Sequence, residues 1–296
     1  MVPEAMQSLR RAILALLCAA LVAAVGVSTA TGGTAPKRAD KNLGWVLSNP
    51  RIHNLLWDDN WTGHNSITKG QIHTFSRRLA GGSWAGPASQ YGVKSLTLSE
   101  TKESGGLCDK RPSSTVSTAK VLLWVACMIL PGTGVQIPTP RLPISNDLYV
   151  VYLPESTTIS DNLSIDSFTV LGKTFGPFTF VKSTSCDDYG AYHALSLYLG
   201  GLYPIAIIPA KCAGGSIDKL TAAASHEIIE AATDPIPGAG WIDTSIPNSS
   251  PSFRRLKEGE VGDICSSAGA VPTATLTRGG FAVVPYWSNR AGACVG

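Results

Sequence analysis

The residues with the clearest capacity for chemistry are His226, Glu227 and Glu230, in the segment HEIIE. Positions 226 and 230 are four residues apart, so a helix directs both side chains to the same side. Two ligands held by one helix suit a divalent metal ion, and zinc accepts imidazole and carboxylate together. Glu227 is next in sequence and could take a proton from a metal-bound water, as in the HExxH proteases. The segment therefore predicts one divalent ion, Zn²⁺, with Glu227 as the catalytic base.

The same segment also fits a helix that binds no metal. Such a helix has a solvated acidic face and one histidine that is hydrogen-bonded in the core. A glutamate replaces the second histidine of the HExxH motif, which weakens the motif as a signal but keeps a donor that zinc accepts. Both interpretations stay open from the sequence alone.

The sequence predicts some of the helices and strands that must position these residues. The segment LTAAASHEIIEAAT predicts a helix that Ser216 or Asp218 caps and that ends at Asp234, because the residue before proline avoids the helical region. Helical spacing also covers 66–79, and a short strand is expected after Val46. Runs of β-branched and aromatic residues predict strands at 148–153 and 203–208, with further candidates at 178–182, 191–198 and 281–287.

One apolar run, VLLWVACMIL within 113–130, fits a buried helix or a buried strand equally well. With that alternative open, we expect an α/β (α+β) fold. Its mixed sheet carries a metallopeptidase-like helix and is stabilised by disulfides.

The N-terminal segment has the three parts of a secretory signal peptide. Arg10 and Arg11 give it a charged start, residues 12–27 form an apolar run, and small residues lead to Ala30. The run is shorter than the roughly 20 apolar residues that a membrane span needs. We expect a signal peptide at 1–30, a flexible leader at 31–44 and a single globular domain at 45–296. The mature protein is then secreted and free of the membrane, and a retained signal anchor is the alternative.

The cysteines agree with an oxidising compartment. Cys18 lies within the predicted signal peptide, and the six cysteines that remain favour three disulfides in an exported chain. No cysteines form a CxxC pair, so a thiolate zinc site is not expected. Proximity in the sequence suggests three pairs: Cys108 with Cys127, Cys186 with Cys212, and Cys265 with Cys294.

The charge of the chain is nearly balanced, with 24 Lys and Arg residues against 21 Asp and Glu residues. This balance argues against nucleic acid as the main partner. The many glycines and prolines suit a compact extracellular domain with many turns. We expect a monomer whose substrate is a peptide or a cell-wall component.

Three stretches of the C-terminal part are similar to a known family: SHEIIEAATDPIPGAGWID, EGEVGDIC and VVPYWSNRAGACV. They resemble the exordium or phosphate-induced protein family of plants, together with its secreted bacterial relatives. Upstream, the segment from Cys186 to Cys212, with Tyr192 and His193 inside it, is similar to the family's Cys, Gly-Tyr/Phe-His and Cys region. The resemblance is strong over residues 180–296, which carry the site, and looser over 45–180. The chain lacks the additional mid-chain cysteines of plant members, and Asp234 replaces a plant asparagine.

This resemblance implies a metal site more than it implies proteolysis. Family members look like distant relatives of zinc metallopeptidases, but plant members are known chiefly as cell-wall growth-response proteins. Besides the helix motif, the match to the family's E-x-GD-x-C segment comprises Glu260, Gly262, Asp263 and Cys265. Asp263 is the expected third metal ligand, and Glu260 competes for that place. Either residue could instead belong to an exposed acidic turn.

Other residues could surround the ion. His193 lies in a predicted strand, where a packed core histidine is the first expectation and a metal ligand or a transition-state donor is the alternative. Asp234 either orients His226 from behind or serves only the end of the helix. The N-terminal histidines are expected at the surface: His53, His64 and His73.

Two functions fit these features. The first is a secreted zinc-dependent hydrolase of the metallopeptidase kind, in which His226, Glu230 and Asp263 hold the ion and Glu227 moves protons. Two carboxylates place more negative charge on zinc than most sites do, which predicts slow turnover or a harder metal. The second is a non-catalytic binding or signalling protein, extracellular or associated with the cell wall, whose metal is structural or absent.

Overall fold

The computed structural model describes residues 38–41, 45–130, 145–161, 183–187, 189–198, 201–246, 259–266 and 276–296. It also describes short strands at 21–22, 164–165, 168–170, 173–175 and 178–179. The predicted signal peptide and leader lie outside the described residues, except for 21–22 and 38–41. Within the described part of the chain, no helix combines the length and the apolar character that crossing a membrane requires.

A mixed sheet forms the centre of the fold, as expected. Its five main strands follow in the order β13 (Tyr192–Tyr198), β14 (Gly201–Pro209), β6 (Asp147–Leu153), β3 (Arg51–Leu56) and β4 (Thr97–Glu103). The last four are mutually parallel, and β13 is antiparallel to β14. The two-residue strand β1 (Leu21–Val22) pairs with the free edge of β13. Strand β6 is buried along its whole length, which explains its continuous apolar run.

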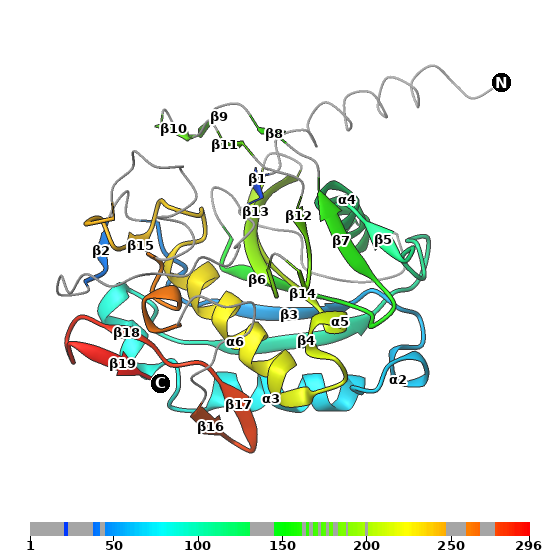
Figure 1. Ribbon diagram of the computed structural model, residues 1–296, viewed down its shortest axis with the longest axis horizontal. Coiled ribbons are helices and arrows are strands. Elements are labelled where there is room, and N and C mark those ends of the chain that lie inside the picture. The colour runs from blue at the N-terminus through cyan, green and yellow to red at the C-terminus, as the bar shows by residue number, and fades with distance from the viewer. Residues whose placement is uncertain are drawn as a thin grey trace.

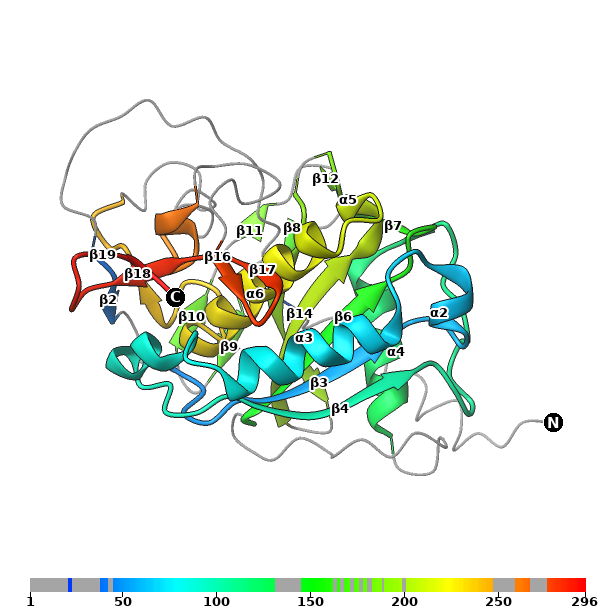
Figure 2. The ribbon, with the colours of Figure 1, turned by 90° about the horizontal axis from the view of Figure 1, so that it is seen from below.

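Helices cover both faces of this sheet (Figures 1 and 2). Helices α3 (Lys69–Gly81) and α6 (Ile217–Thr233) share one apolar core with strand residues such as Val150 and Ile208. Helix α4 (Thr118–Ile129) shares the opposite core with the adjacent strand residues Val151 and Ile207. Successive side chains of a strand point to opposite faces, so each strand contributes to both cores. The site-bearing helix α6 is therefore packed directly on the sheet.

Shorter elements complete the described part of the chain. The helical ones are α2 (Trp61–His64), α5 (Ala210–Ala213) and the 3₁₀ turns η1 (Gly86–Tyr91) and η2 (Asp263–Cys265). The strands are β2 (Asp40–Lys41), β5 (Thr115–Val116), β7 (Thr158–Asp161), β8 (Ser164–Ile165), β9 (Phe168–Val170), β10 (Lys173–Phe175), β11 (Phe178–Thr179), β12 (Ser183–Thr184), β15 (Trp241–Ile242), β16 (Leu276–Arg278), β17 (Phe281–Val283), β18 (Tyr286–Ser288) and β19 (Ala293–Val295).

Two local details go beyond the sequence patterns. The ambiguous run in 113–130 is the helix α4, which begins where the Ser117 side chain accepts a hydrogen bond from the Lys120 N–H. The single strand expected at 281–287 is divided into β17 and β18. Pro285 lies between them and has no N–H to offer a ladder.

The three disulfides pair as proximity in the sequence suggested: Cys108 with Cys127, Cys186 with Cys212, and Cys265 with Cys294. The first joins α4 to the segment before it, and the second joins α5 to the segment before β13. The third joins η2 to the C-terminal strand β19. Two of the three therefore tie down segments next to the candidate metal ligands.

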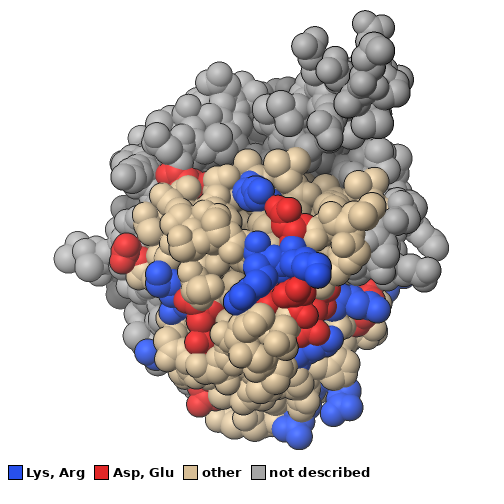
Figure 3. Space-filling view, turned by 90° about the vertical axis from the view of Figure 1, so that its right-hand side faces the viewer, with Lys and Arg blue, Asp and Glu red and all other residues tan. Residues whose placement is uncertain are grey.

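The charges of the described surface are mixed. Figure 3 shows a face on which Lys and Arg side chains lie among Asp and Glu side chains, with large uncharged areas between. Opposite charges also pair at the surface, as Lys69 and Glu103 do at 2.8 Å. This face carries no broad surface of one sign among the described residues.

The expectation that His53 lies at the surface is wrong. Its side chain is fully buried in β3, where Nδ1 lies 3.1 Å from Glu100 Oε1 and Nε2 lies 2.9 Å from Asp147 Oδ1. Arg51 also donates two hydrogen bonds to Asp147, at 2.8 and 2.9 Å. Burial alone would lower the pKa of His53, but the bonds to Asp147 and Glu100 outweigh it and raise the pKa. The partners come from the neighbouring parallel strands, which the sequence around His53 does not reveal.

The raised pKa of His53 predicts a pH-dependent stability. Its contribution is complete below the unfolded-state pKa of about 6.5 and is lost as the pH rises through the higher folded-state pKa. We expect His53→Gln to lower the unfolding free energy by about 1–3 kcal/mol at pH 6, and by less at pH 9. Urea unfolding from pH 5.5 to 9 measures this, with His73→Gln at a half-buried position of α3 as the control. A constant difference between wild type and His53→Gln across this range would contradict the prediction.

Candidate metal centre

Helix α6 presents the HEIIE residues to the protein interior. The helix begins after Ser216, whose side chain accepts a hydrogen bond from the Lys219 N–H. Its last residue is Thr233, one residue before the predicted end at Asp234, which caps it. His226, Glu227 and Glu230 are only 7%, 3% and 0% exposed. The interpretation of a helix with a solvated acidic face is therefore wrong.

Three potential ligand atoms meet beside this helix. His226 Nε2 lies 3.1 Å from Glu230 Oε1 and 3.3 Å from Asp263 Oδ1. One ligand atom of each residue lies within 4.8 Å of the other two. Ligand atoms bound to a tetrahedral zinc ion at about 2.0–2.1 Å are themselves about 3.4 Å apart. The three side chains thus have the spacing that a small divalent ion requires.

Asp263 lies in a loop, residues 259–266, that is fixed near both ends. The Val261 carbonyl accepts a hydrogen bond from the Trp287 N–H at 2.7 Å. The disulfide between Cys265 and Cys294 holds the other end. The disulfide of Cys265, two residues from Asp263, thus helps to fix the loop that presents the proposed third ligand. Asp263 is 7% exposed, so the alternative of an exposed acidic turn is wrong.

Gly262 allows this loop to approach the helix. A Cβ atom at this position would lie 2.7 Å from Glu230 Oε1 and 3.0 Å from His226 Nδ1. The φ angle of −72° is one that any residue adopts, so the requirement for glycine is one of space. The close approach lets the Asp263 N–H donate to Glu230 Oε1 at 3.1 Å. Sequence reasoning named Gly262 only as a match to a family segment and did not find this packing role.

His193, in strand β13, lies against the same helix and is 1% exposed. Its Nε2 donates to the Asp234 carbonyl at 3.1 Å. In the neutral ring the lone pair is then on Nδ1, which lies 3.5 Å from Glu227 Oε2 and 3.7 Å from Glu230 Oε2. Metal-binding histidines are oriented in this way, with the second nitrogen donating to a carbonyl. His193 is buried, as expected, but among carboxylates.

Asp234 shapes the turn after the helix. Its carboxylate accepts backbone hydrogen bonds from Gly238, Ala239 and Gly240 at 2.6, 3.0 and 2.6 Å. Burial raises the pKa of Asp234 to about 6, although His193 and these N–H groups act in the opposite direction. Through its carbonyl Asp234 orients His193. Of the two roles expected from the sequence, orienting His226 or serving the end of the helix, these contacts fit the second.

Several polar atoms of this site are buried without a hydrogen-bond partner among the described residues. They are His193 Nδ1, Glu227 Oε2, Glu230 Oε2, Asp263 Oδ2 and both carboxylate oxygens of Glu260. Native proteins leave few buried polar atoms unpaired, and a bound ion can serve as the partner of such atoms. Burial and the nearby Glu230 carboxylate raise the pKa values of Glu260 and Asp263 well above their usual range. A cation would remove this repulsion.

Without a metal ion, the same contacts would be ion pairs between protonated histidines and carboxylates. Burial alone would lower the pKa of His226, but Glu230 and Asp263 raise it well above its usual value. Burial alone would raise the pKa of Glu230, but His226 and His193 lower it. Protonated histidines thus compensate Glu230, but they leave the Glu260 and Asp263 carboxylates with raised pKa values. The donor set could therefore hold a divalent ion, which would neutralise these two carboxylates as well.

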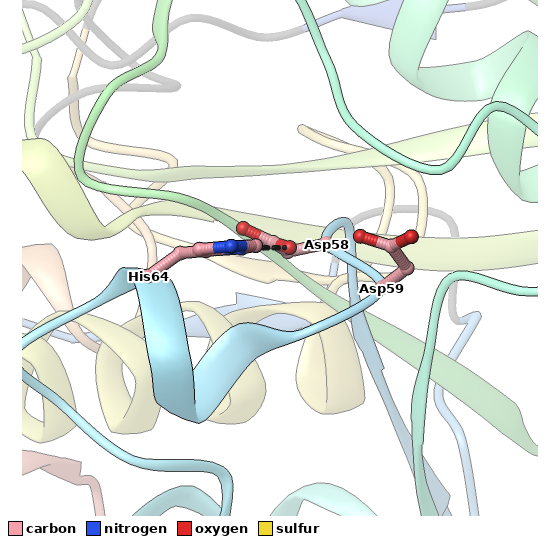
Figure 4. Close-up of side chains that lie close together, drawn as sticks. All are labelled: Asp58, Asp59 and His64. Carbon is pink, nitrogen blue, oxygen red and sulfur yellow. Dashed lines mark hydrogen bonds and ion pairs between the residues drawn. The ribbon is translucent and has the colours of Figure 1, made fainter.

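A second group of potential ligands lies near the surface and consists of Asp58, Asp59 and His64 (Figure 4). His64 Nδ1 contacts Asp58 Oδ1 at 2.8 Å, the contact that is dashed in Figure 4. Basic side chains lie beside both carboxylates, with Lys110 3.7 Å from Asp59 and Arg111 3.6 Å from Asp58. This group is compensated by the chain itself and does not call for a cation.

Comparisons of the chain with models of protein families, with curated protein sequences and with solved structures find no match. The interpretation of the site therefore rests on its geometry and on the residue patterns of the sequence.

Substitution of Gly262 tests the close approach between the loop and α6. We expect Gly262→Ala to lower the unfolding free energy by about 1–3 kcal/mol, the usual cost of overpacking, and to weaken zinc binding by displacing Glu230 and Asp263. Thermal unfolding and zinc titration measure the two effects. Gly86→Ala is the matched control, because a Cβ atom there meets nothing within 4 Å. Equal behaviour of the two variants would show that the loop is not held as described.

Proposed function

We propose that this protein is an exported zinc-dependent hydrolase that cleaves peptide bonds. In this proposal His226, Glu230 and Asp263 hold the ion, and Glu227 is the general base. The observation that carries it is the convergence of three ligand atoms in a buried site whose other carboxylate oxygens have no hydrogen-bond partner among the described residues.

The donor set suits a catalytic ion more than a structural one. Structural zinc sites have four protein ligands, whereas catalytic sites have three and leave one position for water or substrate. His226 and Asp263 are each 7% exposed, and Glu230 is fully buried. The side of the site formed by His226 and Asp263 is therefore the one nearest to solvent, where a substrate would approach.

The ion and Glu227 would have different roles in the hydrolysis. A bound zinc ion would supply Lewis-acid polarisation of the peptide carbonyl and would make a water molecule more acidic. Glu227 would accept the proton of the attacking water and pass it to the leaving amine. Burial raises the pKa of Glu227, which suits a carboxylate that must accept and then release a proton near neutral pH.

Three features support export. The three disulfides are typical of oxidising compartments. The sequence predicts a signal peptide at 1–30, and the resemblance of residues 180–296 to the exordium family implies a secreted or wall-associated protein. A non-catalytic binding protein would share all three features, so the experiments below test the ion and the chemistry separately.

Protein purified from culture medium without chelator should contain at least one equivalent of a divalent ion. Removing the ion should lower the thermal unfolding midpoint, because an ion that binds only the folded state at 100 times its Kd stabilises it by about 2.7 kcal/mol. Elemental analysis and calorimetry measure both effects, and adding Zn²⁺ back should restore the midpoint. A content below roughly 0.2 equivalents would refute the ligand assignment.

Substitution of Glu227 separates binding from catalysis. We expect Glu227→Gln to keep its zinc but to hydrolyse a broad peptide library at least about 100-fold more slowly, since the general base is lost. Asp218→Asn, on the exposed first turn of the same helix, is the control and should leave hydrolysis unchanged. If Glu227→Gln retained both zinc and full activity, or if the wild type hydrolysed no peptide, the binding-protein interpretation would be favoured.

A further inference from the structure

The carboxylates around α6 exceed what one divalent ion neutralises. The Asp234 carboxylate accepts hydrogen bonds from the turn after the helix. The other four carboxylates are at most 7% exposed: Glu227, Glu230, Glu260 and Asp263. The ion pairs that they make in the described part of the chain involve only His193 and His226. When all four carboxylates are ionised and both histidines are neutral, one divalent ion leaves two negative charges in the interior, and two ions leave none. Buried charge without a partner is strongly unfavourable, so the charge count favours two ions.

Glu230 faces two histidines with its two oxygens. Oε1 lies 3.1 Å from His226 Nε2, and Oε2 lies 3.7 Å from His193 Nδ1. Oε1 also accepts the Asp263 N–H, while Oε2 has no hydrogen-bond partner among the described residues. A carboxylate held in this way between two nitrogen donors is arranged to bridge two ions.

A second set of three ligands shares Glu230 with the first. One ligand atom each of His193, Glu230 and Glu260 lies within 4.8 Å of the other two, and all three side chains are buried. Glu260 is 1% exposed, and in the described part of the chain neither of its oxygens has a hydrogen-bond partner. The two ring nitrogens of His193 face different members of this set, because Nδ1 lies 3.7 Å from Glu230 Oε2 and Nε2 lies 3.6 Å from Glu260 Oε1. Glu260 therefore does not compete with Asp263 for one place, because each completes a different set.

We propose that the site is a two-ion centre in which Glu230 bridges. The first ion binds His226, Glu230 and Asp263, and the second binds His193, Glu230 and Glu260. This inference rests on the proposed function, because it takes the first ion as given. Two-metal sites place their ions about 3.5–4 Å apart and stabilise the attacking and the leaving atom together. The second set has two carboxylates and one imidazole, so it accepts Mn²⁺ as well as Zn²⁺.

Zinc stoichiometry tests the proposal. The exported protein, stripped with a chelator, is titrated with Zn²⁺ in a calorimeter, and tightly bound zinc is then measured by elemental analysis after desalting. We expect two equivalents for the wild type and one for Glu260→Gln, which keeps the first set intact. Asp59→Asn is the control for the surface group of Asp58, Asp59 and His64, and it should keep two equivalents.

A spectroscopic measurement on the unmodified protein does not depend on how well a variant folds. Two Mn²⁺ ions joined by a carboxylate are magnetically coupled, so the electron paramagnetic resonance spectrum of the Mn²⁺-loaded wild type should change between one and two equivalents. A spectrum that only doubles in intensity would mean that the second ion is remote from the first.

The outcomes separate this inference from the proposed function. Two coupled equivalents, with one lost in Glu260→Gln, support the two-ion centre. A single equivalent in the wild type overturns the two-ion centre and leaves the one-ion hydrolase standing. A second equivalent that is lost in Asp59→Asn also overturns it, because that ion then belongs to the surface group. No bound zinc at all refutes the proposed function together with this inference.

Discussion

Negative charge buried beneath helix α6 is the interaction on which this part of the structure depends. Carboxylates from α6 and from loop 259–266 meet at a place where water is largely excluded, so their repulsion is weakly screened. Among the described residues, only His193 and His226 form ion pairs with them. Each element around the site must therefore hold like charges close together, and a divalent ion would make this arrangement favourable.

The scaffold meets this demand with covalent and backbone restraints. The Cys265–Cys294 disulfide and the hydrogen bond from Trp287 to Val261 fix the ligand loop. On the other side, Cys186 and Cys212 join the segment before β13 to the segment before α6. Rigid support of this kind lets ligands keep their positions against mutual repulsion, which is the general requirement for a preorganised metal site.

The parts of this site that could be predicted are those that depend on nearby residues. The start of α6 follows from the Ser216 cap, its end from Pro235, and the pairing of the disulfides from short separations in the chain. The approach of Asp263 was accessible only through a resemblance, since 33 residues separate it from Glu230. No local pattern could show that Gly262 must lack a Cβ atom.

The same limit explains the error at His53. Its partner Asp147 is 94 residues away and lies on the adjacent parallel strand. Strand pairing, and not sequence proximity, brings them together, so the surface expectation lacked the deciding contact. By contrast, the residues that decide between helix and strand in 113–130 are local, but a fully apolar run carries no periodicity that distinguishes the two.

Two groups of buried acidic side chains among the described residues, one at Asp147 and one beneath α6, differ in how their charge is compensated. The difference explains why only the second is a candidate metal site. Burial alone would raise the pKa of Asp147, but hydrogen bonds from His53, Arg51 and Ser145 lower it to about 2. The guanidinium of Arg51 is a permanent cation, so that group is complete within the chain. Around α6 no Arg or Lys is paired with the carboxylates in the described part of the chain, and the pKa values of Glu260 and Asp263 are raised instead. An ion there would therefore contribute to the stability of the fold and to the chemistry through the same contacts.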